Sequence, residues 1–159
     1  MLPLEDTLVG LAVALGIGLL IGTERERNKG QGSSRAIAGV RTFALTSLAG
    51  AIALSIGEVA LGILGVIVGL LVVVGYQRTR SHDPGITTEI AQLTTFLLGA
   101  WAMRQPGLAA GVGVIVAIVL ASRSRLHTFI HRVLTDAEVH DGLLLAAAAL
   151  VILPLLPDK

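Results

Sequence analysis

Six long apolar stretches dominate the sequence and constrain its fold more than any other feature. Each has 15 to 21 residues, close to the roughly 17–25 that a helix needs to cross about 30 Å of hydrocarbon. None alternates polar and apolar residues, which argues against membrane-spanning barrel strands. We therefore predict an all-α, polytopic membrane helix bundle that forms a single domain over residues 1–159. Its six transmembrane helices are expected at 7–22, 36–56, 59–76, 86–103, 108–122 and 142–156.

The composition supports a membrane protein and excludes several functions. Hydrophobic residues make up 53% of the chain and charged residues 14%, against about 25% charged residues in ordinary soluble domains. The chain has no cysteine, which rules out disulfides, thiol catalysis and thiolate metal sites. Aromatic residues are only 3%, which argues against nucleic-acid binding by base stacking. Because neither a nucleophile motif nor a phosphate loop is present, we predict no enzymatic activity and no cofactor.

The positive charges predict how the chain lies in the inner (plasma) membrane. The flank before the first apolar stretch carries Glu5 and Asp6 and no Lys or Arg, so this stretch is not a secretory signal. If the N-terminus lies outside, only Arg104 and Lys159 fall on the outer side. This strong positive-inside bias predicts a multi-pass protein with both termini outside. The inner side then receives Arg25, Arg27, Lys29, Arg35, Arg41, Arg78, Arg80, Arg123, Arg125 and Arg132.

An amphipathic helix is expected at about 123–137, on the inner membrane surface. Its apolar residues recur at helical spacing, which is typical of a helix lying in the interface. His127 and His131 are spaced as a metal-binding pair on this helix, but no third ligand is evident, so we expect them to face lipid headgroups or water. The apolar residues are Leu126, Phe129, Ile130, Val133 and Leu134.

Small residues spaced four apart predict close helix packing. Such residues let helix backbones approach each other inside lipid. Two interpretations stay open: packing inside one chain, or a seam between two copies. We expect internal packing for most of them, and a two-fold homodimer for the assembly. The three series are Gly10, Ala14, Gly18 and Gly22; Gly65 and Gly69; and Ala109, Gly113, Ala117 and Ala121.

Polar residues within the apolar stretches predict a functional site, because ionisable groups at membrane depth are costly. They occur at the inner end of the first helix, five or six residues into the second, and at the start of the fourth. We expect Arg41 to pair with Glu24 or Glu26. The cluster is either a set of ion pairs that holds the helices together or a binding site for a small ion. Its oxygen ligands would suit Mg²⁺ or protons. The candidates are Glu24, Glu26, Arg41, Thr42, Thr87, Thr88, Glu89 and Gln92.

Three motifs resemble those of the MgtC/SapB family of bacterial inner-membrane proteins. They are GLLIGTERE at 18–26, AGVRTFAL at 38–45 and GITT at 85–88. The likeness runs through about residues 7–105. It implies a role linked to magnesium limitation, acid tolerance or intracellular survival, and some members are thought to regulate other membrane machinery, including ATP synthase. The matching positions are Glu24, Arg25, Glu26, Arg41, Thr42, Thr87 and Thr88.

Departures from the family pattern leave two alternatives open for the chain and for its function. A sixth helix, Glu89 and the end of the chain at 153–158 look like the N-terminal half of a longer MgtC-like group, so the chain either stands alone or works with a second membrane half.

The first hypothesis is transport or ion homeostasis, with magnesium or another small charged solute bound at the cluster. The second is a regulatory module that binds another membrane protein or its own copy. Water access to Glu24 and Glu89 separates the two, because a transport site needs a hydrated path.

Overall fold

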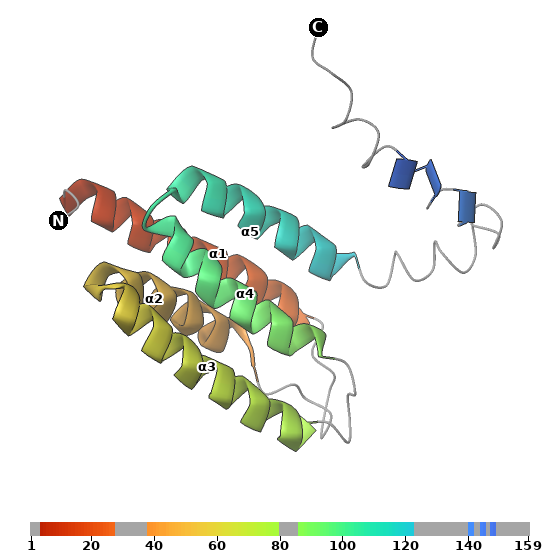
Figure 1. The fold of residues 1–159 in the computed structure, drawn as a ribbon, viewed down its shortest axis with the longest axis horizontal. Helices are drawn as coiled ribbons and strands as arrows, with labels where there is room; N and C mark the ends of the chain where they lie inside the picture. Colours follow the sequence, from red (N-terminus) through yellow and green to blue (C-terminus); the bar gives the residue numbers. More distant parts are fainter. Residues whose placement is uncertain are drawn as a thin grey trace, which may run out of the picture. The chain divides into compact units, whose positions relative to one another are not determined.

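The chain folds into α-helices in this computed structural model, which describes residues 4–27, 38–79 and 86–122 and short helical pieces at 140–141, 144–145 and 147–148. No strand occurs in these ranges, which confirms the all-α prediction. The sixth apolar stretch lies mostly outside the described residues, and the amphipathic segment 123–137 entirely so. The helices are α1 (Leu4–Arg27), α2 (Val40–Ile56), α3 (Glu58–Thr79), α4 (Thr87–Ala102) and α5 (Pro106–Ala121) (Figure 1).

The chain divides into two units, Met1–Leu120 and Ala121–Lys159, and the helix bundle belongs to the first. Short connections join α2 to α3 and α4 to α5. Gly57 alone separates α2 from α3, with a φ of 152° that favours glycine, and its N–H donates to the carbonyl of Ala53 at 3.1 Å. Between α4 and α5, the N–H groups of Arg104 and Gln105 both donate to the carbonyl of Trp101. Pro106 then opens α5, at a position where no helical N–H partner is lost.

Helices α1, α2 and α4 pack with their backbones in close approach. A Cβ on Gly18 would lie 2.7 Å from the Cα of Ala44, and one on Gly22 would lie 2.8 Å from the Cα of Val40. Gly50 and Gly99 sit where α2 crosses α4, against the backbone carbonyls of Phe96 and Ser47. The prediction that these small residues serve internal packing is therefore confirmed for α1. Gly50 and Gly99 are not among the small residues for which the four-residue spacing predicted close packing.

Helices α3 and α5 are held more loosely. The contact of α3 with α4 centres on Phe96, which packs against Val68 and Val72, and Gly69 has nothing within 4 Å of where a Cβ would lie. Helix α5 meets α1 where Gly113 lies against Ile17. The outward side of α3 is an unbroken apolar surface with Val59, Ile63, Val66, Ile67, Leu70 and Leu71 exposed.

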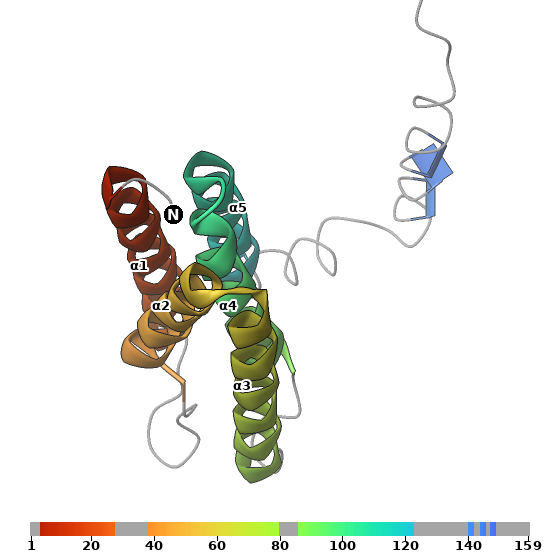
Figure 2. The ribbon, with the colours of Figure 1, turned by 60° about the vertical axis from the view of Figure 1, so that its left-hand side comes forward.

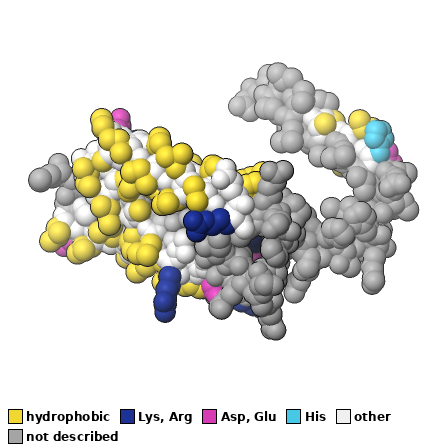
Figure 3. Space-filling view, turned by 90° about the horizontal axis from the view of Figure 1, so that it is seen from below, with side chains coloured by type: hydrophobic (Ala, Val, Ile, Leu, Met, Phe, Trp, Pro, Cys, Tyr) yellow, Lys and Arg dark blue, Asp and Glu magenta, His cyan; other side chains and the backbone are white. Residues whose placement is uncertain are grey.

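Apolar side chains cover much of the described surface of the bundle (Figure 3). Soluble monomers rarely expose contiguous apolar patches of this extent, so this surface belongs against lipid or another protein. Two helices are long and apolar enough to cross a membrane, Leu4–Arg27 and Glu58–Arg78. Their 24 and 21 residues correspond to about 36 and 31 Å of helix. Helices α2 and α5 are apolar but shorter.

Candidate functional site

The end of α1 and the starts of α2 and α4 lie at one end of the bundle (Figure 2). The contacts give this arrangement: Gly22, near the end of α1, lies against Val40, the first residue of α2. Gly10, near the start of α1, lies against Met103, just past the end of α4. Each of these helices therefore runs antiparallel to α1. We call the residues at this end of the three helices the polar end, because most of the predicted site residues lie there.

Glu24 and Arg25 form a buried ion pair at the polar end. Helix α1 continues to Arg27, five residues beyond the predicted 7–22, so both residues lie within helical structure. The Nε of Arg25 donates to Oε2 of Glu24 at 2.7 Å, and the two side chains are 7% and 9% exposed. A hydrogen-bonded ion pair of this kind is strong where water is excluded, because each partner would otherwise be a buried, uncompensated charge.

Glu26 links the end of α1 to the start of α2. Its Oε2 accepts a hydrogen bond from the N–H of Val40 at 3.4 Å, and the contact is partly buried. Gly39, the N-cap of α2, has no side chain to cap the helix. A carboxylate at a helix N-terminus is favoured by the exposed N–H groups and the helix dipole. This hydrogen bond places Glu26 at the contact between α1 and α2.

Arg41 lies elsewhere than the sequence suggested. Helix α2 begins at Val40, after an extended Gly39, and not at residue 36. Arg41 is therefore in the first turn, where its side chain is exposed. Within the described ranges Arg41 makes no hydrogen bond or ion pair, so the predicted pairing with Glu24 or Glu26 is wrong. Residues 36–40 are all apolar or glycine, so the apolar pattern could not locate the start of α2 among them.

A second polar contact joins α2 to α4. The Nε2 of Gln92 donates to Oγ1 of Thr46 at 3.5 Å. Thr95, one turn further along α4, is fully buried and donates to the carbonyl of Ala91. Thr46 was not among the predicted site residues, although it stands one turn beyond the predicted Thr42 and shares its helix face. Thr42 and Thr88 are half-buried, and Thr87 is exposed.

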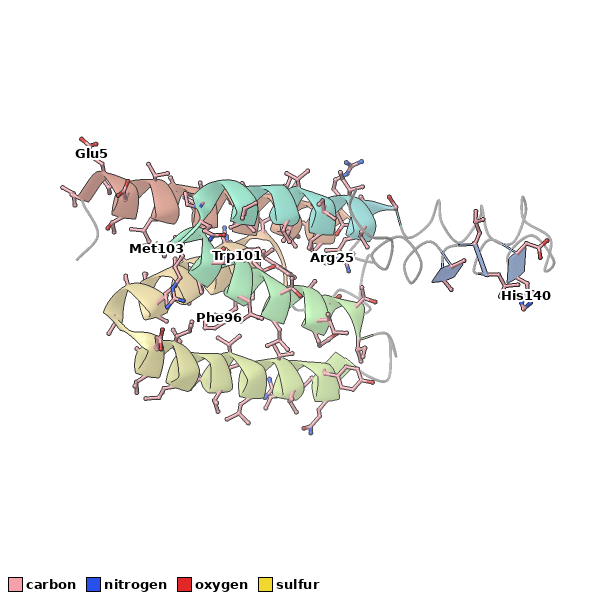
Figure 4. All side chains as sticks on the ribbon, turned by 45° about the horizontal axis from the view of Figure 1, so that its top comes forward. Glu5, Arg25, Phe96, Trp101, Met103 and His140 are labelled. Carbon is pink, nitrogen blue, oxygen red and sulfur yellow. The ribbon has the colours of Figure 1, made fainter. Side chains whose placement is uncertain are left out.

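Glu89 stands apart from these contacts. Its Oε2 is buried and has no hydrogen-bond partner. Phe96 follows it by seven residues, which places the two about 20° apart around the helix. Because Phe96 lies between α4 and α3 (Figure 4), Glu89 lies on the α3 side of α4, about 60° around the helix from Gln92, which bonds Thr46. A buried carboxylate oxygen without a donor is costly, and a proton or a bound cation would relieve that cost.

The described residues hold no ready-made metal cage. No group of three or more His, Cys, Asp or Glu in them is arranged to hold a metal ion. Magnesium does not require such a group, since it keeps several waters and is usually bound through one or two carboxylates. The histidine pair His127 and His131 lies outside the described residues.

The apolar exterior and the polar residues gathered at one end define a helical membrane protein. The model of the MgtC family matches residues 11–129, and the chain belongs to this family. The resemblance inferred from the three sequence motifs is thereby confirmed. Searches of curated proteins and of solved structures gave no match.

Proposed function

We propose that this protein serves ion homeostasis by binding a small cation, for which magnesium is the candidate, at Glu89. The observation that carries the proposal is the buried Oε2 of Glu89, which has no hydrogen-bond donor. The other carboxylates of the polar end are engaged: Glu24 bonds Arg25, and Glu26 bonds the first N–H of α2. Glu89 is therefore the carboxylate best suited to a cation. Membership of the MgtC family supports a link to magnesium.

A neighbouring polar group suits a hard cation. Gln92, about one turn along α4 from Glu89, offers an amide oxygen, since the bond to Thr46 uses its Nε2. Oxygen ligands of this kind are preferred by Mg²⁺, which also retains water. Transport through such a site requires a hydrated path to it. The proposed ion-transport role therefore includes a hydrated path to Glu89.

Magnesium binding by the full chain in non-ionic detergent tests this assignment. We expect Glu89→Gln to weaken the affinity measured by isothermal titration calorimetry at least tenfold, because the carboxylate charge is lost. Glu5→Gln is the matched control, since Glu5 is exposed at the other end of α1 from Arg25 (Figure 4). We expect it to bind like the unchanged protein. Equal binding by the two variants would remove Glu89 from the site.

We also propose that the chain crosses the inner membrane six times, with both termini outside. The positive-inside distribution supports this orientation. The natural chain has no cysteine, so single cysteines can report it. Gly30→Cys and Thr128→Cys should react with a membrane-impermeant thiol reagent only from the cytoplasmic side. Pro3→Cys and Asp158→Cys should react only from outside, and labelling of Gly30→Cys from outside would reverse the topology.

A regulatory module without transport is the second candidate function. The burial of the Glu24–Arg25 pair favours it, since an interacting module can seal its charges as pairs. The exposed apolar side of α3 offers a surface for a second copy, another membrane protein or a second membrane half. Native mass measurement in mild detergent tests the predicted homodimer. A stable dimer that binds no magnesium would favour this candidate over the first.

A further inference from the structure

Arg25 has hydrogen-bonding capacity that its ion pair does not use. The guanidinium carries several N–H donors, but within the described part of the chain only Nε is bonded. The side chain is 7% exposed. Glu89 Oε2 is the one fully buried side-chain polar atom without a hydrogen-bond partner in that part of the chain. The terminal amino groups of Arg25 are unbonded and are not among the fully buried atoms. They therefore remain accessible at the end of a buried side chain.

Arg25 lies on the face of α1 that is turned toward α2 and α4. Around the helix it is about 20° from Gly18, which packs on α2, and about 60° from Gly10, which packs on α4. Gly10 stands beside Ala102 and Met103. Because α1 and α4 are antiparallel, fifteen residues along α1 from Gly10 to Arg25 correspond to about fifteen residues back along α4. Arg25 is then level with Thr87 and Thr88, at the start of α4.

Two helix N-termini lacking side-chain caps flank this position. Neither Gly39 of α2 nor Ile86 of α4 makes a side-chain cap hydrogen bond. Glu26 takes the first N–H of α2, which leaves the N–H groups of Arg41 and Thr42 without partners in the helix. The first-turn N–H groups of α4 lack helical partners in the same way. Both helix starts carry partial positive charge and favour an anion.

Among the described residues at the polar end, three positive side chains of α1, α2 and α4 stand beside three negative ones. The last turn of α3 adds Arg78. Because the described negative charges do not exceed the positive ones, the partial positive charges of two helix starts and the unbonded amino groups of Arg25 favour a negative ligand. The positive residues are Arg25, Arg27 and Arg41, and the negative residues are Glu24, Glu26 and Glu89.

We propose that the terminal amino groups of Arg25, between the starts of α2 and α4, bind a phosphate group. A planar guanidinium matches the geometry of phosphate oxygens, and helix N–H groups complete the shell of donors. The hydroxyls of Thr87 and Thr88 add further donors at the same level. The phosphate belongs either to an anionic lipid headgroup or to a free phosphate ion. This proposal stands on residues other than Glu89 and is independent of the cation site.

One experiment with two arms distinguishes a lipid headgroup from a free phosphate ion as the source of the phosphate group. In the first, the full chain in maltoside detergent without lipid or magnesium is titrated with inorganic phosphate by calorimetry. In the second, the chain in phosphatidylcholine nanodiscs, with and without phosphatidylglycerol, is analysed by native mass spectrometry for retained lipid. Saturable binding in the first arm identifies free phosphate. Preferential retention of phosphatidylglycerol in the second identifies a headgroup.

In whichever arm shows binding, we expect Arg25→Gln to weaken it at least tenfold. Arg25→Lys keeps the charge but loses the planar fork, so it should bind severalfold more weakly than the unchanged protein. Arg104→Gln is the control, because Arg104 is 61% exposed and bound to Glu58, and it should bind normally. If Arg25→Gln does not fold, Arg25→Lys and Thr88→Val are measured in its place. Each is then expected to weaken phosphate binding.

Three results would overturn the proposal. The first is unchanged binding by the Arg25 variants, and the second is an equal loss in Arg104→Gln. The third is the absence of saturable binding in both arms. Magnesium is absent throughout, so none of these results depends on the cation site at Glu89.

Discussion

Helix α4 makes two very different contacts, one with α2 and one with α3. Against α2, Gly50 and Gly99 bring the two backbones together, and a side chain at either position would meet a carbonyl of the other helix. Against α3, the contact centres on the ring of Phe96, and Gly69 of α3 faces open space. Because lipid gives apolar side chains little reason to associate, close backbone packing is the stronger of the two arrangements.

The polar groups also differ between the tightly packed side of α4 and the side that faces α3. On the tightly packed side, Ser47 donates to the carbonyl of Ala14 at 2.6 Å and Gln92 donates to Thr46. On the α3 side, Oε2 of Glu89 is buried without a partner. Polar groups at the α1–α2–α4 contacts thus stabilise the bundle, whereas the unsatisfied group lies beside the loosely held helix. This difference is why we assign the cation to Glu89.

The largest expected effect comes from filling the tight crossing. Gly99→Leu forces a side chain into the carbonyl of Ser47, and we expect a loss of about 3 kcal/mol or more in the free energy of unfolding, at the upper end for overpacking. Gly69→Leu, at an open position on α3, should change it by less than about 0.5 kcal/mol. Thermal unfolding in detergent measures both. Similar losses would show that α3 is packed as tightly as α2.

A smaller effect is expected from breaking the buried ion pair. Glu24→Gln leaves Arg25 largely uncompensated, and we expect a loss of about 2–3 kcal/mol, below the value for deeply buried pairs because the pair lies at a helix end. Glu58→Gln breaks the Glu58–Arg104 pair, whose side chains are 81% and 61% exposed, and should cost about 1 kcal/mol or less. A double-mutant cycle of Glu24→Gln with Arg25→Gln should show coupling. Additive losses in that cycle would contradict the pairing.

The smallest expected effect is the loss of one hydrogen bond between helices. Ser47→Ala removes the bond to Ala14 from a fully buried position, and we expect a loss of about 1 kcal/mol, as for other hydrogen bonds between membrane helices. Ser55→Ala is the control on the same helix, since Ser55 is exposed and bonds only to Ile52 within α2. It should be nearly neutral in the same unfolding measurement. Equal losses would mean that the Ser47 bond contributes nothing specific to the α1–α2 contact.

The sequence by itself determined the helices and the family. An apolar run of this length is a local property, so five of the six predicted stretches correspond to helices whose ends differ from the prediction by up to five residues. The GLLIGTERE and GVRT motifs are local as well, and they identified the MgtC family before any contact was known. The helix ends were hardest to place next to charged residues or glycine, as at Glu24 and Gly39.

Only the tertiary structure decided which polar groups meet. The sequence placed Arg41, Glu24 and Glu89 at one end of the bundle, but it could not tell that Glu24 bonds its neighbour Arg25 or that Arg41 is exposed. Such pairings depend on how far each helix is rotated and shifted along its neighbour. Contacts such as Gly99 against Ser47 set that register, and they join residues distant in the chain. Periodicity within one helix carries no information about its rotation relative to another, which is the physical reason that the site was visible only in the folded protein.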